Sequence, residues 1–200
     1  MLHKLSCTTY NSAMATPRGT ATRARILQAA ADLLADRNPR TLTVSEVARS
    51  AGVYPNQITH HFGSKDRLVV DAAFVRFLRD TTRLQAAGRR ASTSEGFRDV
   101  LARTALAMPS TGLLVTALGL AQGDAALRER TSTLLAVLFR QSERWLERVV
   151  ADHGWTSERG VARDARTFWS AVFGAVLFAT AGAVGGPSDV DVAATVSIRG

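Results

Sequence analysis

The hydrophobic positions of this chain recur every three or four residues, which is the spacing of an α-helix. The first repeat begins at Ala21 and stops at Asn38-Pro39, and a capping-box pattern from Thr43 to Glu46 opens the next. None of the five prolines interrupts a repeat. No segment alternates apolar and β-branched residues as a strand would. The pattern therefore predicts an all-α fold of eight or nine helices.

Residues 43–68 predict two short helices joined by a tight turn. Gly52 ends the first, because glycine adopts the left-handed backbone of such a turn at little cost. Pro55 lies in the first turn of the second helix, which stops at Gly63-Ser64. Two short helices joined so closely cross at a large angle. This arrangement lets the second helix enter the major groove of DNA while the first lies across the backbone.

The second half of the chain predicts further helices. Residues 92–95 have the spacing of another capping box, and Asp124 opens a long amphipathic helix. Thr156 or Ser157 is predicted to cap an alanine-rich helix, and residues 187–200 are predicted to form a weak tail. None of these elements carries a catalytic motif, so we expect no enzymatic activity and no cofactor.

Charge is distributed unevenly along the chain. Residues 1–90 carry 14 Lys and Arg against 6 Asp and Glu, while residues 91–200 carry 11 of each, so the first half holds the whole net charge of +8. Such an excess favours a polyanion as partner, although an acidic membrane surface or a merely solvated basic face fits the charge as well. Cys7 is the single cysteine, which excludes an intramolecular disulfide. Without a signal segment, a cytoplasmic location is expected.

Residues 167–188 carry no charge, and their length alone would admit a membrane span. Their composition is dominated by Ala, Gly, Ser and Thr, and we therefore expect no membrane association but a helix at a contact between two subunits. Packing of the same small residues within one subunit is the alternative. The predicted dimer interface consists of Ala171, Gly174, Ala175, Phe178, Ala179 and Gly182.

The second short helix has outer side chains that suit base recognition. Asn and Gln can hydrogen-bond to the edge of adenine, and Thr can contact a thymine methyl group. Simple solvation at a helix start is the alternative. The predicted base contacts are Tyr54, Pro55, Asn56, Gln57 and Thr59. The predicted phosphate contacts are Arg23, Arg25, Thr43, His60, His61 and Lys65. The adjacent histidines lie on different faces of the helix and have no third ligand nearby, so no metal site is expected.

Residues 21–78 resemble the DNA-binding domain of TetR/AcrR-family transcriptional regulators. The resemblance is carried by ARILQAAADLLA, by T-V-x-E-V-A-x-x-A-G-V at 43–53 and by H-F-G-S-K-D-x-L at 61–68. It implies a repressor that binds a palindromic, double-stranded DNA operator as a homodimer and senses a small molecule in a C-terminal helical bundle. The family commonly has Tyr where this chain has Thr59, so the operator is expected to differ. Tyr54 is a candidate substitute for the missing aromatic contact, and capping of the helix or packing against it is the alternative.

The resemblance divides the chain into a disordered arm (1–19), a helix-turn-helix domain (20–67) and a helical ligand-binding and dimerisation domain (68–200). Charged residues are scarce on the inner faces of that last part, which favours an apolar or amphipathic effector. A helical scaffold protein, or an enzyme without a recognisable motif, is the alternative function. The predicted pocket residues, which a plain hydrophobic core would also explain, are Phe97, Leu101, Met108, Leu113, Phe139, Trp145, Phe168, Trp169 and Phe173.

Overall fold

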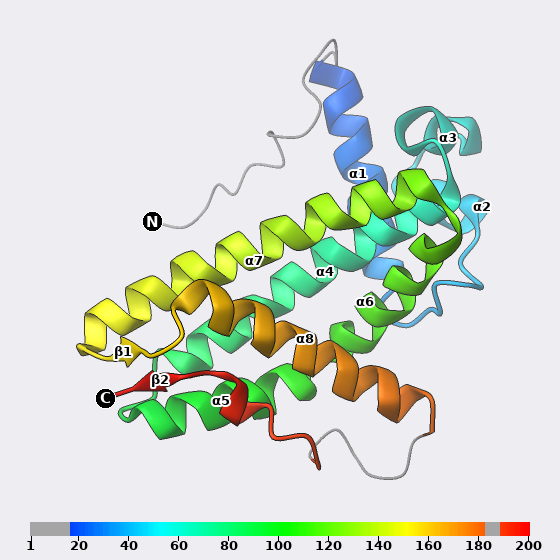
Figure 1. Ribbon diagram of the computed structural model, residues 1–200. Coiled ribbons are helices and arrows are strands. Elements are labelled where there is room, and N and C mark those ends of the chain that lie inside the picture. The colour runs from blue at the N-terminus through cyan, green and yellow to red at the C-terminus, as the bar shows by residue number, and fades with distance from the viewer. Residues whose placement is uncertain (1–16, 183–188) are drawn as a thin grey trace. The chain divides into compact units, whose positions relative to one another are not determined.

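The computed structural model describes residues 17–182 and 189–200, which form two compact units divided after Ala72 (Figure 1). The first unit contains α1 (Pro17–Leu33), α2 (Val44–Ala51), α3 (Pro55–Phe62) and the start of α4 (Lys65–Gly88). The second contains the rest of α4, then α5 (Ser94–Leu106), α6 (Pro109–Leu120), the 3₁₀ turn η2 (Ala121–Gly123), α7 (Ala125–His153), β1 (Thr156–Ser157), α8 (Val161–Thr180), the 3₁₀ turn η4 (Ala193–Thr195) and β2 (Ile198–Arg199). The prediction of an all-α fold is confirmed.

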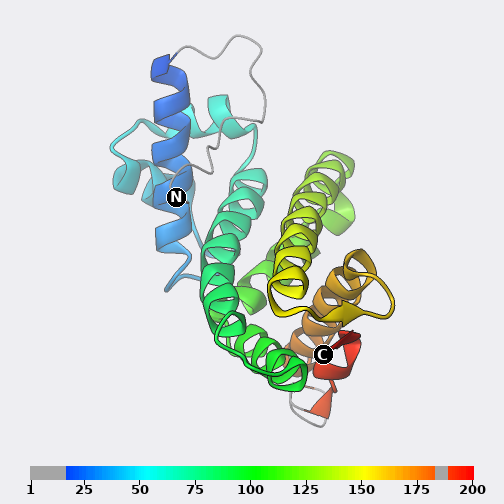
Figure 2. The ribbon, with the colours of Figure 1, turned by 90° about the vertical axis from the view of Figure 1, so that its left-hand side faces the viewer.

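In the first unit, three helices pack around one small core. α1 contacts both α2 and α3, and α2 contacts α3, as Figure 2 shows. The core is built from buried apolar residues of each of these helices and of the start of α4, including Ile26, Ala30, Val47, Ile58, Phe62 and Leu68. Residues 1–16 of the predicted arm lie outside the described residues. Residues 17–19 form the first turn of α1, where Pro17 is tolerated because that turn needs no amide donor.

In the second unit, α8 is the central helix. It contacts α5, α6 and α7. Phe77 of α4 packs edge-on against Trp169 of α8 with ring centroids 5.0 Å apart, and Phe173 stacks on the same indole at 5.8 Å. Trp169 itself is 2% exposed. This aromatic cluster joins α4 to α8 and gives the second unit a hydrophobic core of its own.

Two helix starts differ from those predicted. α5 is capped by Thr93, whose hydroxyl accepts a hydrogen bond from the Gly96 amide at 3.1 Å, one residue later than the predicted box. Three consecutive residues with hydroxyl groups can each act as a cap, and the pattern could not select among them. α8 is capped by Gly160, because Thr156 and Ser157 pair with β2 instead. Their hydroxyls are therefore not at the helix start.

The predicted weak tail is in fact ordered from residue 189 onward, while residues 187 and 188 lie outside the described residues. Residues 192–200 form what we call the C-terminal strap, in which Val192, Val196 and Ile198 are buried. β2 of the strap pairs antiparallel with β1 and contacts α5 (Figure 1). The three buried side chains explain why the strap packs down: each removes apolar surface from water.

A buried carboxylate holds the strap in place. Asp164 of α8 is 0% exposed and accepts hydrogen bonds from the Ser197 amide at 3.0 Å and the Ser157 hydroxyl at 2.8 Å. The Ser197 hydroxyl and the Arg159 guanidinium also donate to it, at 2.9 and 3.4 Å. Buried charged groups are costly unless they are fully hydrogen-bonded, and these donors meet that condition.

No single helix within the described ranges is both long enough and apolar enough to cross a membrane. α5 and the α6–η2 segment reach that length and composition only when joined, and they are bent by 62° at the junction.

Removing the Asp164 carboxylate tests its role in the second unit. Asp164→Ala leaves the Ser157 hydroxyl and the Ser197 amide without their acceptor and removes one of the two acceptors of the Arg159 guanidinium, so we expect it to lower the free energy of unfolding by about 3 kcal/mol. Chemical denaturation measures this loss, and hydrogen exchange should show faster exchange at the amides of the strap. Asp152→Ala, at an exposed carboxylate of α7, is the control. Unchanged protection of the Ser197 amide would contradict the assignment.

Candidate nucleic-acid interface and ligand cavities

Local hydrogen bonds fix the start of α2. The Thr43 hydroxyl accepts from the Glu46 amide at 3.2 Å, and the Glu46 carboxylate accepts from the Thr43 amide at 2.8 Å. This reciprocal box, with the Thr43 hydroxyl as its strongest contribution, lowers the pKa of Glu46. Gly52 ends α2 with a φ of 62°, a backbone that residues with a Cβ adopt only with strain. The predicted capping box and glycine turn are both confirmed.

α3 has one buried face and one accessible face. Ile58 and Phe62 are 0% and 2% exposed and point into the core of the first unit. Thr59 and His60 follow Asn56 by three and four residues, and all three are exposed, so they form one row on the outer face. Pro55 is exposed and Gln57 is half-buried. The candidate base contacts on α3 are thus accessible to a partner.

Tyr54 stands out among the exposed residues of the first unit. It occupies the N-cap position of α3, but its side chain makes no capping hydrogen bond. With 79% of its surface exposed, it does not pack against the domain either. A large aromatic side chain at the start of the outer face of α3 is therefore free to contact a partner.

The candidate phosphate contacts fall into two groups. Arg25, Thr43 and His60 are exposed, whereas Arg23, His61 and Lys65 are half-buried. The Lys65 ammonium donates a hydrogen bond to the Arg40 carbonyl at 3.1 Å. Lys65 therefore connects the start of α4 to the loop before α2, a contact that the sequence pattern did not indicate.

Arg23 also has a partner within the first unit. Its guanidinium lies 3.0 Å from the carboxylate of Asp71, which is 2% exposed, and 4.6 Å from the centre of the Phe62 ring. Sequence reasoning placed Arg23 at DNA phosphate and missed Asp71 altogether. The signal was present: Asp71 is an acidic residue within an otherwise apolar run, which indicates a buried charge with a partner.

His60 and His61 lie edge to face, with ring centroids 5.1 Å apart. Burial lowers the pKa of His61, and the neighbouring charges of His60 and Arg23 lower it further. His61 is therefore largely uncharged at neutral pH in the free protein. No group of three His, Cys, Asp or Glu residues suited to a metal ion occurs in residues 17–182 and 189–200.

The second unit encloses a narrow hollow of about 30 Å³, which we call the inner cavity. α4, α5, α7, α8 and the strap all contribute to its wall. It is lined by Thr81, Leu84, Gln85, Leu101, Leu138, Gln141, Ser142, Trp145, Leu146, Ala165, Phe168, Trp169 and Val196. Four of the nine predicted pocket residues, Leu101, Trp145, Phe168 and Trp169, are among them.

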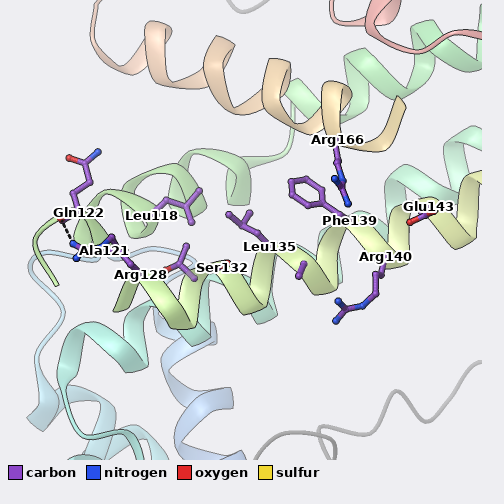
Figure 3. Close-up of a pocket in the computed structure, with 12 residues that line it drawn as sticks. Leu118, Ala121, Gln122, Arg128, Ser132, Leu135, Phe139, Arg140, Glu143 and Arg166 are labelled. Atoms are coloured by element: carbon purple, nitrogen blue, oxygen red, sulfur yellow. Dashed lines mark hydrogen bonds between the residues drawn. The ribbon is translucent and has the colours of Figure 1, made fainter. Parts of the chain in front are cut away.

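An open hollow of about 640 Å³ lies between α6, α7 and α8, and we call it the outer groove (Figure 3). It is lined by Leu118, Ala121, Gln122, Arg128, Thr131, Ser132, Leu135, Ala136, Phe139, Arg140, Glu143 and Arg166. Phe139 is the predicted pocket residue in this set, and Arg166 extends from α8 toward its ring, 6.0 Å from the centroid. The outer groove is therefore apolar along its floor and carries charge at its margins.

The other predicted pocket residues lie elsewhere. Met108 borders a third hollow near the start of α6. Phe97, Leu113 and Phe173 line none of these three hollows. Phe97 is 0% exposed and contacts Trp145 with ring centroids 5.6 Å apart. It therefore packs against a residue that lines the inner cavity without lining the cavity itself.

The small residues of α8 do not share one face. Ala175 is 3% exposed, Ala171 and Gly174 are half-buried, and Ala179 is exposed. A spacing of four residues advances about 40° further than one helical turn, so the alanine stripe winds from the surface into the core. For Ala175, the alternative of packing within its own subunit holds. The end of α8 exposes Leu177 and Phe178, by 51% and 61%, and Gly182 is exposed in the turn that follows the helix.

Comparisons with known proteins agree with this architecture. A sequence profile described as "Bacterial regulatory proteins, tetR family" matches residues 26–72, and one described as "Bacterial transcriptional repressor C-terminal" matches residues 94–197. The HTH-type transcriptional repressor KstR2 of Mycolicibacterium smegmatis is 43% identical over 47 residues, which are 24% of this chain and 23% of that protein. The chain thus matches less than a quarter of the length of this relative.

Solved structures resemble the chain over most of its length. A protein from Rhodococcus sp. RHA1, described as a candidate transcriptional regulator, has 28% identity and a TM-score of 0.69 over 86% of this chain and 91% of its own. The fatty acid degradation regulator FadR from Bacillus halodurans has 17% identity and a TM-score of 0.57, with 91% and 95% covered. Reduced NemR from E. coli has 18% identity and a TM-score of 0.54, with 87% and 95% covered.

The fold is that of a helix-turn-helix regulator with a C-terminal helical domain. The chain belongs to the TetR family of bacterial transcriptional regulators, and its profile matches support a transcriptional repressor without enzymatic activity.

Two arginines of α1 separate a role in folding from a role in DNA binding. Arg23→Ala leaves the buried Asp71 without its guanidinium, so we expect the free energy of unfolding of the first unit to fall by about 2 kcal/mol. Arg25→Ala, at an exposed position of the same helix, should change it by less than about 0.5 kcal/mol. Hydrogen exchange at the α3 amides measures both. Equal effects of the two substitutions would contradict the structural role of Arg23.

Proposed function

We propose that the protein is a ligand-responsive repressor that binds a palindromic DNA operator as a homodimer and is released by a small effector. The observation that carries this proposal is the outer row of α3, in which Asn56, Thr59 and His60 are exposed while the opposite face is anchored in the core. A short helix held in this way after a tight turn suits insertion into the major groove.

The candidate base contacts act together at the start of α3. Asn56 and Gln57 can recognise adenine through paired hydrogen bonds, and Thr59 can contact a thymine methyl group. The exposed ring of Tyr54 beside Pro55 supplies the apolar or stacking surface that Thr59 lacks. We assign sequence discrimination to these five residues.

The candidate phosphate contacts surround α3. Arg25, His60 and the start of α2 at Thr43 are accessible, and free amides at a helix start favour anions. Lys65 and His61 can reach phosphate if their present contacts rearrange. Arg23 would act at the backbone only as a secondary role, because its guanidinium is already engaged by Asp71.

The division of labour follows the predicted boundaries. Residues 20–67 bind DNA, and residues 68–200 bind the effector and the second subunit. A repressor must meet its operator, so we place the protein in the bacterial cytoplasm.

A second copy of the chain is needed because one helix-turn-helix contacts only a few base pairs, and two-fold symmetry supplies the second half-site. Leu177 and Phe178 project from the end of α8, and the outer groove offers an apolar floor on the same unit. In a two-fold arrangement each copy would place its projecting residues against the apolar surface of the other. This complementarity supports a dimer through α7 and α8.

Base recognition is tested on DNA selected by the wild-type protein from a random-sequence library. Asn56→Ala should weaken binding to the selected sequence by about 1–3 kcal/mol and relax one position in each half-site, because a paired base contact is lost. Gln28→Ala, at an exposed amide of α1, is the control and should change neither. Gel-shift titrations measure the affinities. An unchanged base preference after Asn56→Ala would count against the role assigned to α3.

Dimer formation is tested by placing a charge on the exposed end of α8. Phe178→Glu should convert the dimer to a monomer in sedimentation experiments and reduce affinity for a two-half-site operator at least tenfold, because a carboxylate cannot be buried in an apolar contact without a partner. Thr82→Glu adds the same charge at an exposed position of α4 and should leave both unchanged. A Phe178→Glu protein that remains dimeric would exclude this surface.

A further inference from the structure

The inner cavity has no charged lining. Its polar groups are the hydroxyls of Thr81 and Ser142, the amides of Gln85 and Gln141, and two indoles, and every other lining side chain is apolar. The outer groove differs, because three arginines and a glutamate border it. A charged molecule in the inner cavity would lose its hydration without gaining a counter-charge, which is strongly unfavourable. The inner cavity therefore suits an uncharged molecule.

The two indoles of the inner cavity differ in their hydrogen bonds. Trp169 Nε1 donates to the Ser142 hydroxyl at 2.9 Å. Trp145 is 5% exposed, and its Nε1 is fully buried without an acceptor among the described residues. Buried indole N–H groups usually have a partner, because leaving one unmatched costs free energy. Trp145 is also held tightly, since a Cβ built on Gly88 would lie 2.9 Å from its ring.

We infer that the inner cavity binds an uncharged, mainly apolar molecule with an oxygen that accepts a hydrogen bond from Trp145 Nε1. A ketone, ester or ether oxygen meets this requirement. The inference rests on the proposed function in one respect, namely that this molecule is the effector. It makes Trp145 a specificity-determining residue, whereas Trp169, whose donor is already engaged, contributes apolar surface only.

The inner cavity must widen to admit such a molecule. Its volume of about 30 Å³ exceeds the space that one water needs but is smaller than a six-membered ring requires. The part of its wall formed by the long side chains of Gln85 and Gln141, both half-buried, can move without unfolding a helix. The bound state consequently differs in conformation from the narrow state, which is the condition for a ligand to shift an equilibrium between the two.

Three probes of similar size and different chemistry test the inference on the full-length protein without DNA. Cyclohexanone carries the acceptor oxygen, methylenecyclohexane replaces it with a CH₂ group, and cyclohexanecarboxylate adds a charge. The chain has three tryptophans, so the indole N–H signals in a ¹⁵N-labelled sample are few, and single Trp→Phe variants assign them. Cyclohexanone should shift the Trp145 indole signal and bind about threefold to tenfold more tightly than methylenecyclohexane, the gain expected from one hydrogen bond. Cyclohexanecarboxylate should bind more weakly than either.

A matched pair of variants tests whether the preference for cyclohexanone over methylenecyclohexane depends on the indole of Trp145. Trp145→Phe should abolish the difference between cyclohexanone and methylenecyclohexane, whereas Trp169→Phe should retain it. If Trp145→Phe fails to fold, the indole shifts of the wild-type protein still decide. Equal affinity for the two neutral probes, tighter binding of the carboxylate, or an unmoved Trp145 signal would each overturn the inference.

Measuring operator affinity in the presence of the probes distinguishes a failure of this inference from a failure of the proposed function. If cyclohexanone shows the expected preference for Trp145 but saturating amounts leave operator affinity unchanged, the cavity chemistry stands and the proposed ligand response fails. If operator affinity responds to cyclohexanone and methylenecyclohexane alike, the response stands and the role of Trp145 fails.

Discussion

The anchoring of α3 by Ile58 and Phe62 is the interaction on which the accessible surface of the first unit depends. A helix of eight residues is too short to be stable in water by its own hydrogen bonds, so its structure must come from packing. Two fully buried side chains on one face supply that packing. They also leave Asn56, Thr59 and His60 outward, because residues on the other face cannot reach the same core. The polar row is therefore a consequence of where the apolar residues lie.

Both units use a buried carboxylate to fix a contact between distant parts of the chain. Asp71 binds Arg23, 48 residues away, and Asp164 binds Ser197, 33 residues away. Apolar packing tolerates small changes of register, whereas a buried charge is stable only when specific donors surround it. Asp71 thereby fixes the position of α1 against the start of α4, and Asp164 fixes the C-terminal strap.

Features encoded within a few residues could be predicted from the sequence. The Thr43–Glu46 box, the Gly52 turn and the Asp124 cap all follow from local signals, and the structure has them. Features that depend on distant residues could not be predicted in the same way. The apolar run around Asp71 indicates a buried charge, but no local signal identifies Arg23 as its partner or the Arg40 carbonyl as the acceptor for Lys65. The C-terminal strap illustrates the same limit. Its apolar side chains are buried only through contacts with α5 and α8, which are distant in the sequence, so the sequence around the strap does not predict their burial.

The two hollows of the second unit differ in charge because a buried charge is stable only when specific partners surround it. Arg128, Arg140 and Arg166 border the outer groove, which is open to solvent, while no charged residue lines the inner cavity. A ligand in the inner cavity must therefore gain its affinity from apolar contact and from the few donors present. Because the cavity is narrow, part of that affinity is used to separate its walls. A molecule that leaves the Trp145 donor unmatched has less free energy available for this step, which links the chemistry of the ligand to its power to change the conformation.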